Sequence, residues 1–475
     1  MRPFTTLLAM AAVLATAGLS LADSSTTTPA PAVTAGTASA SLPQVAPKKA
    51  KPAPAPATVS ASAPADTNPL LMYSLDQIKT GDTSVGQSLS NAGIDIYGYL
   101  EMGYTADLAG PPPAGTTIPG RVFDTEYGNH LQMDQLDLTI AKAINFSDPK
   151  YIKRGWDIGG HFEFIYGYDP SYGGDSFHSS GLDFGYNPAS KFSPLYQADI
   201  EQAYVTLALH LGGAGNVKFK VGKFVTLMGE ETINPTTNFL YSHTYSFGYM
   251  IPFTHTGVLA EYAPNSQWTF YAGITRNWNQ TFYNNNSSVD FLGEVGYAPS
   301  SHWDFVVNLS VGPEDGAMGN ATFGNNNNYR TVVEPLITYV PPILNNALTL
   351  VSDTVAAYDG AGNSTNGNRP SGWFSEALYQ NYALNRYFSF TTREEYAYVG
   401  SGLGSAGIGI NPFGIESYTN MGDLTFGVKI TPFPKGSLSK NFYIRPEIRE
   451  DLADHAVFNG NYYQTTFGID AIYQF

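Results

Sequence analysis

Charged residues recur at every second position in several segments of the sequence. Arg445, Glu447 and Arg449 are spaced in this way, and Arg393 and Glu395 repeat the spacing earlier in the chain. Side chains two apart in an extended chain point to the same face. Acids and bases that alternate along one face create a local electric field, which acts on ions and polar solutes rather than on covalent bonds.

Other charged or titratable residues occupy equivalent positions elsewhere in the chain. For any single one of them, solvation with cross-strand ion pairing is the simpler role, and only the collection indicates a wet interior surface. The candidates for residues that line such a surface are Glu101, His161, Glu163, Arg393, Glu395, Arg445, Glu447 and Arg449.

Apolar residues take the opposite face of these segments. In "IDIYGYLEMGYT", Ile94, Ile96, Leu100 and Met102 alternate with polar residues, and similar alternation recurs in "WDIGGHFEFIYG", "DLTFGVKITPF" and "NFYIRPEIRED". Such strands fit a soluble sandwich that turns its apolar face inward. They fit equally a membrane barrel that turns its apolar face to lipid.

The lengths of the strands and of their connections distinguish the two folds. Most candidate strands have the ~9 to 11 residues that cross a bilayer at a tilt, whereas strands of soluble sheets usually have ~5 to 6. The connections alternate between mostly short and long, as in outer-membrane barrels. We count sixteen candidate strands, at roughly residues 94–105, 131–144, 155–167, 198–211, 216–225, 255–263, 267–277, 289–298, 302–312, 328–340, 347–358, 373–383, 387–399, 418–432, 441–452 and 463–475.

The predicted fold class is therefore all-β, a transmembrane antiparallel β-barrel of about 16 strands at residues 93–475, preceded by a short helical segment at 69–92.

Two charged residues do not fall on the polar face of their strands. Lys142 lies near a strand end, from which its long side chain can reach the interface. The position of Glu394 predicts a β-bulge or a shifted register in its strand.

Aromatic residues near strand ends are expected at the lipid–water interface. They are Trp156, Tyr166, Trp268, Trp303, Trp373, Tyr398, Tyr473 and Phe475.

The first residues have the features of a secretory signal. Arg2 precedes an apolar stretch that ends in the small residues Ser20 and Ala22, which predicts cleavage after Ala22 and export to the bacterial outer membrane. A retained membrane anchor is the alternative. Residues 23–68 are rich in Ala, Pro, Ser and Thr and predict a disordered periplasmic spacer.

Composition excludes several classes of function. The 475 residues include no cysteine, which excludes disulfides and thiolate metal sites. A net charge of -16 disfavours a nucleic-acid partner. The eight His residues show no metal-ligand spacing, and no nucleophile motif of a hydrolase is present. We therefore expect no catalytic residue, no cofactor and no metal site.

The long connection at 226–254 differs from the other long connections, which are rich in Asn and Gly. It carries Glu230, Glu231, Asn234, Tyr241 and His243. Such a segment could fold into the lumen and form a constriction at which charged groups select ions. The alternative is a loop packed over the barrel mouth, without a role in selection.

The chain resembles the bacterial outer-membrane porins grouped as the putative beta-barrel porin-2 family. The resemblance spans about residues 70–475 and rests on "SVGQSLSNAGIDIYGYLEMGYT", on "VGKFVTLMGEETINPTTNFLYSHTYSFGYMIPFTHTGVLAEY" and on the aromatic final residues. The middle block is the most specific of the three. The resemblance implies a passive outer-membrane channel and adds no catalytic residue.

The expected function is passive diffusion of small hydrophilic solutes or ions. From residue 69 onward the chain carries 20 basic and 38 acidic residues, which predicts a mild cation preference. Two alternatives stay open: a substrate-specific channel, and a structural or adhesive surface barrel with a plugged lumen. The sequence names neither the solute nor the oligomeric state, and a homotrimer is one candidate.

The final segment, "FGIDAIYQF", alternates like the other strands. Phe467, Ile469, Ala471, Tyr473 and Phe475 are expected to face lipid, in a strand that pairs with the first strand near residue 94 to close the barrel. The resemblance implies a second role for Tyr473 and Phe475, as part of the signal that the barrel assembly machinery of the outer membrane recognises.

We predict that deleting Phe475 impairs assembly more than it changes the conductance of the barrels that do form. Assembly is measured as the amount of heat-modifiable folded barrel in isolated outer membranes. Conductance is measured by single-channel recording. Assembly at the unaltered level would count against the signal role of this residue.

Overall fold

The structure is a computed structural model, and it describes residues 70–80, 83–110, 118–123, 128–171, 196–280, 288–314, 329–360, 370–403, 410–435 and 441–475. The expected signal segment, 1–22, and the expected spacer, 23–68, lie outside the described residues. No helix among the described residues is long and apolar enough to cross a membrane.

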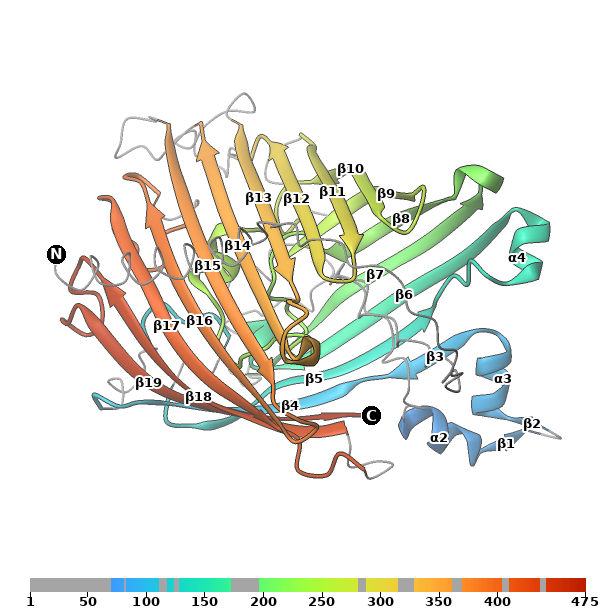
Figure 1. The fold of residues 1–475 in the computed structure, drawn as a ribbon, viewed down its shortest axis with the longest axis horizontal. Coiled ribbons are helices and arrows are strands. Elements are labelled where there is room, and N and C mark those ends of the chain that lie inside the picture. The colour runs from blue at the N-terminus through green and yellow to red at the C-terminus, as the bar shows by residue number, and fades with distance from the viewer. Residues whose placement is uncertain are drawn as a thin grey trace, which may run out of the picture. The chain divides into compact units, whose positions relative to one another are not determined.

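Antiparallel strands close into a single barrel of sixteen strands, as predicted (Figure 1). β3 and β4 follow one another across Gly98 and together form the first strand. All sixteen candidate strands coincide with observed ones to within a few residues. The strands are β3 (Ile94–Tyr97), β4 (Tyr99–Asp107), β5 (Leu131–Lys142), β6 (Trp156–Gly167), β7 (Gln197–His210), β8 (Asn216–Val225), β9 (Thr254–Ala263), β10 (Trp268–Arg276), β11 (Asp290–Ser300), β12 (Trp303–Gly312), β13 (Arg330–Tyr339), β14 (Leu348–Asp359), β15 (Ser371–Ala383), β16 (Phe388–Val399), β17 (Thr419–Ile430), β18 (Phe442–Ala453) and β19 (Tyr463–Gln474).

Apolar side chains face outward from the barrel and polar ones face inward. On β5, Leu136, Leu138 and Ile140 are each 38 to 39% exposed, whereas Asp137 and Thr139 between them are 1% exposed. Outward apolar and inward polar residues are the arrangement that a barrel in lipid requires. The alternation therefore belongs to a membrane barrel and not to a soluble sandwich.

The barrel closes between its last and first strands. β19 pairs with β4 from Thr466 opposite Asp107 to Gln474 opposite Tyr99. The backbones of Phe475 and Gly98 then exchange two hydrogen bonds, at 2.9 and 3.0 Å. The last strand therefore pairs with the first, as expected, and β3 continues beyond the paired residues in register with β5.

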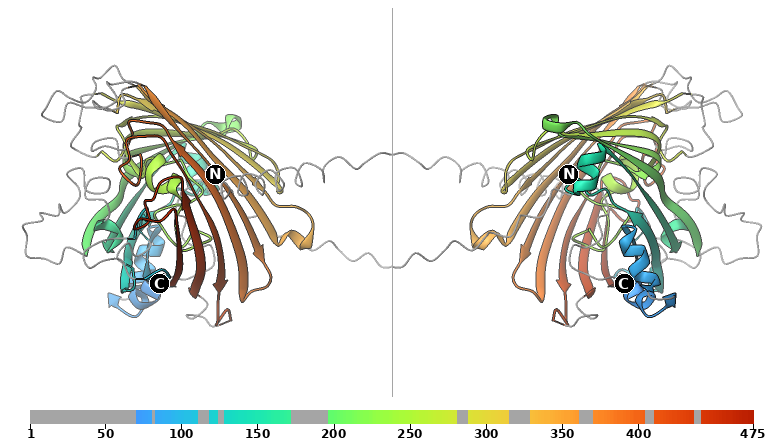
Figure 2. Two further views of the ribbon diagram at one scale, coloured as in Figure 1. Left: turned by 90° about the vertical axis from the view of Figure 1, so that its left-hand side faces the viewer. Right: turned by 90° about the vertical axis from the view of Figure 1, so that its right-hand side faces the viewer.

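Two short helices lie beside the first strand of the barrel. α2 (Leu70–Asp76) and α3 (Val85–Asn91) flank the two-residue strands β1 (Lys79–Thr80) and β2 (Thr83–Ser84), and they contact β3. The Ser84 hydroxyl caps α3 by accepting a hydrogen bond from the Gln87 backbone N–H at 3.0 Å. Figure 2 shows both helices, in blue, near the carboxyl terminus. The remaining helical turns are α4 (Pro149–Arg154), η1 (Asp169–Ser171), η2 (Gly212–Ala214), η3 (Ser246–Met250) and η4 (Leu344–Asn346).

Two expectations about strand faces are wrong. β16 pairs without interruption on both sides of Glu394, so there is no bulge, and Glu394 does face outward. Trp373 faces inward, because its neighbour Phe374 takes the outward position of β15. The Trp373 indole donates a hydrogen bond to the Met250 carbonyl at 3.1 Å and is 2% exposed. Position near a strand end does not determine which face a side chain takes.

We predict that Gly98→Val weakens the closure of the barrel. A Cβ at this position would lie 2.2 Å from the Asp137 carbonyl oxygen and 2.9 Å from the Phe475 ring. Displacing packed backbone costs about 1–3 kcal/mol. Urea unfolding from lipid vesicles measures the loss, and Gly213→Ala is the control, because no atom lies within 4 Å of a Cβ there. An unchanged unfolding midpoint for Gly98→Val would contradict the prediction.

Candidate functional site

The chain between β8 and β9 lies inside the barrel. We call residues 226–253 the crossing segment, because its backbone hydrogen-bonds to inward side chains of β13, β14, β16 and β18. Figure 1 shows this green segment behind strands β14 to β16. The sequence left open whether these residues enter the lumen, and the hydrogen bonds described below place them within it.

Carboxylates of the wall hold two pairs of backbone amides in the crossing segment. Glu447 on β18 accepts hydrogen bonds from the N–H groups of Tyr241 and the next residue, at 2.9 and 3.1 Å. Glu395 on β16 accepts from the N–H groups of Tyr245 and the next residue, at 2.7 and 2.8 Å. Each carboxylate thus satisfies two amides that have lost their contact with water.

Two further carboxylates hold the beginning of the crossing segment. Glu334 on β13 accepts from the Gly229 N–H at 2.6 Å, and Asp353 on β14 accepts from the Glu230 N–H at 3.0 Å. The crossing segment is therefore fixed to four of the six consecutive strands from β13 to β18.

Three wall arginines bind carbonyl groups of the crossing segment. Arg445 donates to the carbonyls of Pro235 and Asn238 at 3.0 and 2.7 Å. Arg393 donates to the carbonyl of residue 242, and Arg449 to that of residue 243. Each guanidinium is at most 2% exposed. The arginines therefore supply the donors, and the glutamates the acceptors, that the buried backbone needs.

Neighbouring acids compensate the charge of these arginines. Arg393 lies 3.1 Å from Asp423, Arg445 lies 2.5 Å from Asp470, and Arg449 lies 2.7 Å from an oxygen of Asp451. A buried guanidinium without such a partner would be strongly destabilising. The three acids come from β17, β18 and β19, so the network links these strands to one another as well as to the crossing segment.

Glycines on the wall leave room for the crossing segment. A Cβ on Gly103 of β4 would lie 2.0 Å from the Tyr241 hydroxyl, and one on Gly427 of β17 would lie 2.3 Å from a methyl group of Leu240. The Tyr241 hydroxyl donates to Asp134 of β5 at 3.0 Å. The tip of the segment therefore packs directly against wall backbone.

The crossing segment covers most of the predicted lining residues. Arg393, Glu395, Arg445, Glu447 and Arg449 point into the barrel, but they hold the segment and are at most 4% exposed. Glu101 on β4 lies 3.4 Å from Arg445 in the same network. His161 and Glu163 lie apart from it on β6, where they hydrogen-bond to each other at 3.0 Å.

The predicted residues of the crossing segment differ in what they contact. Glu231 pairs with Arg393 at 2.8 Å. The Asn234 side chain accepts from the N–H two residues ahead at 3.0 Å, which forms a turn. His243 bonds the Asn238 amide at 3.0 Å. Glu230 is only half-buried.

Some inward side chains are partly exposed on a different part of the wall. On β8 and β9, Lys218 and Glu261 form an ion pair, and their side chains are 16% and 18% exposed. Asp304 on β12 is half-buried. The crossing segment also contacts this side, where the Asn308 amide of β12 donates to the Leu227 carbonyl at 3.1 Å.

Sequence reasoning missed residues that complete the network. Asp423 and Asp470 alternate with apolar residues in their strands, so the period-two pattern could have identified both. Arg121 lies in a long connection, 3.3 Å from Asp451, and Phe123 packs on the His243 ring at 5.4 Å. The period-two pattern of the strands does not identify Arg121 or Phe123. Within the part of the chain that the structure describes, no group of His, Asp or Glu is arranged to hold a metal ion.

Comparisons with known proteins identify one family model and several solved structures of similar fold. The model of the family described as putative beta-barrel porin-2, OmpL-like matches residues 93–475. OprB of Pseudomonas putida is 10% identical, with a TM-score of 0.50 over 82% of this chain and 96% of that chain. The channel DcaP of Acinetobacter baumannii is 13% identical, with a TM-score of 0.48 over 80% and 97%. OmpT of Vibrio cholerae, in trimer form, is 12% identical, with a TM-score of 0.47 over 80% and 99%. No curated protein matches.

We predict that Glu395→Ala combined with Glu447→Ala loosens the crossing segment. Each buried amide left without an acceptor costs about 1–3 kcal/mol. Hydrogen exchange at the amides of Tyr241 and Tyr245 should therefore accelerate about tenfold or more, because local opening limits exchange there. Glu163→Ala is the control, since Glu163 bonds to His161 and Gln202 instead of the crossing segment. Equal exchange in both variants would contradict the anchoring role.

Proposed function

Because the chain belongs to the putative beta-barrel porin-2, OmpL-like family, it is an outer-membrane diffusion channel, and we propose that the crossing segment forms its constriction. Family and fold are those of a channel and not of an enzyme. The observation that carries the proposal is the set of wall anchors, which hold residues 226–253 across the lumen. A segment held in this way narrows an otherwise wide barrel.

We further propose that solutes pass between the crossing segment and strands β8 to β12. The opposite side of the lumen is filled by buried arginines and their partners. Lys218, Glu261, Asp304 and Glu230 have partly exposed side chains, which supports their contact with permeating solutes.

The charges along this route favour cations. The accessible groups include three acidic residues, Glu230, Glu261 and Asp304, and one basic residue, Lys218. Local fields, more than net charge, decide selectivity in a narrow pore. We therefore propose passive diffusion of small hydrophilic solutes and ions, with cations preferred over anions.

A plugged structural barrel is the second candidate function. A buried apolar cluster around Tyr245, Met250, Trp278 and Trp373 fills part of the interior where the strands meet the long connections. This cluster favours a closed lumen. A substrate-specific channel has no comparable observation in its favour, and saturable block of conductance by one solute would identify it.

We also propose three cellular features. The signal is cleaved after Ala22, and the barrel assembly machinery binds the last strand through Tyr473 and Phe475. The barrels associate as a homotrimer, in line with the closed symmetry of most homo-oligomers.

Conductance across a planar bilayer tests the channel directly. The purified, refolded protein should form pores with stable current steps in potassium chloride. Persistent failure to form pores, in preparations whose β-sheet content confirms folding, would favour the plugged structural barrel.

We predict that Glu230→Gln combined with Asp304→Asn weakens cation selectivity. In a salt gradient at a pH above 8, the reversal potential should move toward zero, because burial raises the pKa of Glu230 to about 8 and both acids then carry the negative charges that the substitutions remove. Glu163→Gln is the matched control, since this acid also faces the interior but is 1% exposed and bonded to His161. Anion preference in the unaltered protein would sink the proposed selectivity.

A further inference from the structure

The connections at the two ends of the barrel differ in charge. The mostly short connections between strands are residues 143–155, 211–215, 264–267, 301–302, 340–347, 384–387 and 431–441. Their only acid in the sequence is Asp148, whereas their basic residues are Lys150, Lys153, Arg154, Arg386, Lys435 and Lys440. In the long connections acids outnumber basic residues eleven to three. We call the basic end the short-turn rim, which in outer-membrane barrels faces the periplasm.

Half of the basic residues in these short connections lie on α4. Lys150, Lys153 and Arg154 occupy exposed positions of this helix, and Lys142 ends the strand that precedes it. We call these four residues the α4 basic cluster. Figure 1 shows α4 beyond the start of β6. The cluster therefore concentrates positive charge at one place on the rim of an acidic protein.

Nearby acids do not balance the charge of the cluster. The Asp148 carboxylate caps α4 by accepting the Lys150 backbone N–H at 2.8 Å. Asp157 lies 3.5 Å from Lys142 and 2.5 Å from Arg154, so one carboxylate serves two cations. Within the described residues, the two lysines of the helix have no ion-pair partner. The cluster can therefore accept an anion from its surroundings.

Contacts of a buried tyrosine hold α4 in place. Tyr151 is 1% exposed, and its hydroxyl donates to the Asn216 side chain at 3.0 Å. His210 bonds the same amide oxygen at 3.0 Å. The helix then ends at Gly155, whose φ of 81° turns the chain directly into β6. The cations of α4 are thus presented from an ordered element that is fixed to the barrel.

The cluster adjoins the lipid-facing surface of the barrel. The Arg154 guanidinium lies over the Trp156 ring, 4.7 Å from its centroid, and this ring is 44% exposed. Ile158 continues the outward face of β6, and Ile152 is an exposed apolar residue on α4 itself. Outward Trp rings settle at the level of the lipid headgroups. The cations therefore lie at the depth of the lipid phosphates.

Two other short connections also combine a cation with exposed aromatic residues. Arg386 lies over the Tyr387 ring at 5.1 Å, next to the exposed Phe388. Lys435 is exposed and follows Phe433, which is also exposed. Each of these turns has one such cation among its described residues, so the α4 basic cluster is the strongest site of this kind on the described part of the rim.

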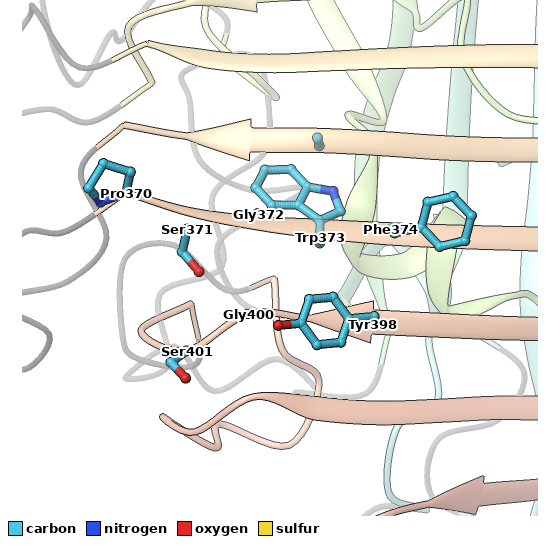
Figure 3. Close-up of a pocket in the computed structure, with 9 residues that line it drawn as sticks. Pro370, Ser371, Gly372, Trp373, Phe374, Tyr398, Gly400 and Ser401 are labelled. Carbon is cyan, nitrogen blue, oxygen red and sulfur yellow. The ribbon is translucent and has the colours of Figure 1, made fainter. Parts of the chain in front are cut away.

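The opposite end of the barrel has outward aromatic residues without such cations. Figure 3 shows the pocket at the ends of β15 and β16 that adjoin long connections, with the rings of Phe374 and Tyr398 beside it. None of the described residues that line this pocket is charged. Aromatic residues near strand ends therefore do not require a basic neighbour, and the cations of the short-turn rim need an explanation of their own.

We propose that the α4 basic cluster binds the phosphate of an anionic glycerophospholipid, such as phosphatidylglycerol, in the periplasmic leaflet. Guanidinium and ammonium groups donate strong, charge-assisted hydrogen bonds to phosphate oxygens. The acyl chains of the same lipid lie along Trp156 and Ile158. The anionic cell wall has no acyl chains to match this apolar surface. The proposal does not depend on the channel activity.

The absence of cysteine from the sequence permits a direct test with single fluorescent labels. Ile152→Cys places a dansyl group on α4. Leu344→Cys places the matched control on η4, an exposed position in a short connection without charged residues. Each labelled protein is refolded into phosphatidylcholine vesicles that contain a small fraction of brominated lipid, because bromine quenches a fluorophore that it contacts. The brominated lipid is either phosphatidylglycerol or phosphatidylcholine.

At residue 152, brominated phosphatidylglycerol should quench several-fold more than brominated phosphatidylcholine. At residue 344 the two lipids should quench equally. Molar salt should remove the preference at residue 152, because it screens exposed charges. Equal quenching by the two lipids at residue 152 in low salt would overturn the proposal, and sedimentation of that protein with purified peptidoglycan would then identify the cell wall as the partner.

A second experiment tests the cations themselves. Each cation near an anionic lipid surface strengthens binding about fivefold. Lys150→Gln combined with Lys153→Gln should therefore bring the quenching ratio at residue 152 close to one, while arginine at both positions should preserve it. Arg386→Gln combined with Lys435→Gln is the control, because it removes the same charge from other turns of the rim.

A lipid preference that survives the loss of both lysines would overturn the role of the cluster. Equal loss in the control variant would also overturn it, because the total charge of the rim would then attract the lipid. Single-channel conductance should stay unchanged in every variant. A protein that keeps the lipid preference but never conducts would contradict the proposed function and support this site.

Discussion

The structure depends on the pairing of backbone groups inside the barrel with charged side chains of the wall. A segment of chain that enters a lumen without forming a strand leaves its amides and carbonyls without partners. Glu395 and Glu447 each accept two amides, and Arg393, Arg445 and Arg449 bind carbonyls. The arginines require acids of their own, which neighbouring strands provide. The wall thus carries this pattern of acids and bases because their side chains pair with the backbone of the crossing segment.

The barrel could be predicted from sequence because its signals are local. Alternation with period two, strand length and connection length each belong to a single segment, and together they located all sixteen strands. The exception depends on a distant contact. Trp373 faces inward, where its indole bonds Met250, which is distant in sequence.

The candidate site was only partly predictable for the same reason. The spacing of Arg445, Glu447 and Arg449 correctly placed them on the inner face. Their partners in the crossing segment lie about two hundred residues earlier, and periodicity carries no information about such contacts. Glu394 is the opposite case. The local register placed it outward, and the bulge expected to explain it is absent. Its carboxylate instead accepts a hydrogen bond from the Gln380 amide of the neighbouring strand.

The crossing segment also has a mechanical consequence. A wide barrel of sixteen strands is a thin shell, whose round cross-section is easily flattened when neighbouring lipids or proteins press on it. The crossing segment leaves the wall at β8 and is tied to β13, β14, β16 and β18, so it spans the shell as an internal strut. Because the same contacts position the crossing segment and brace the wall, the two hold one another in place.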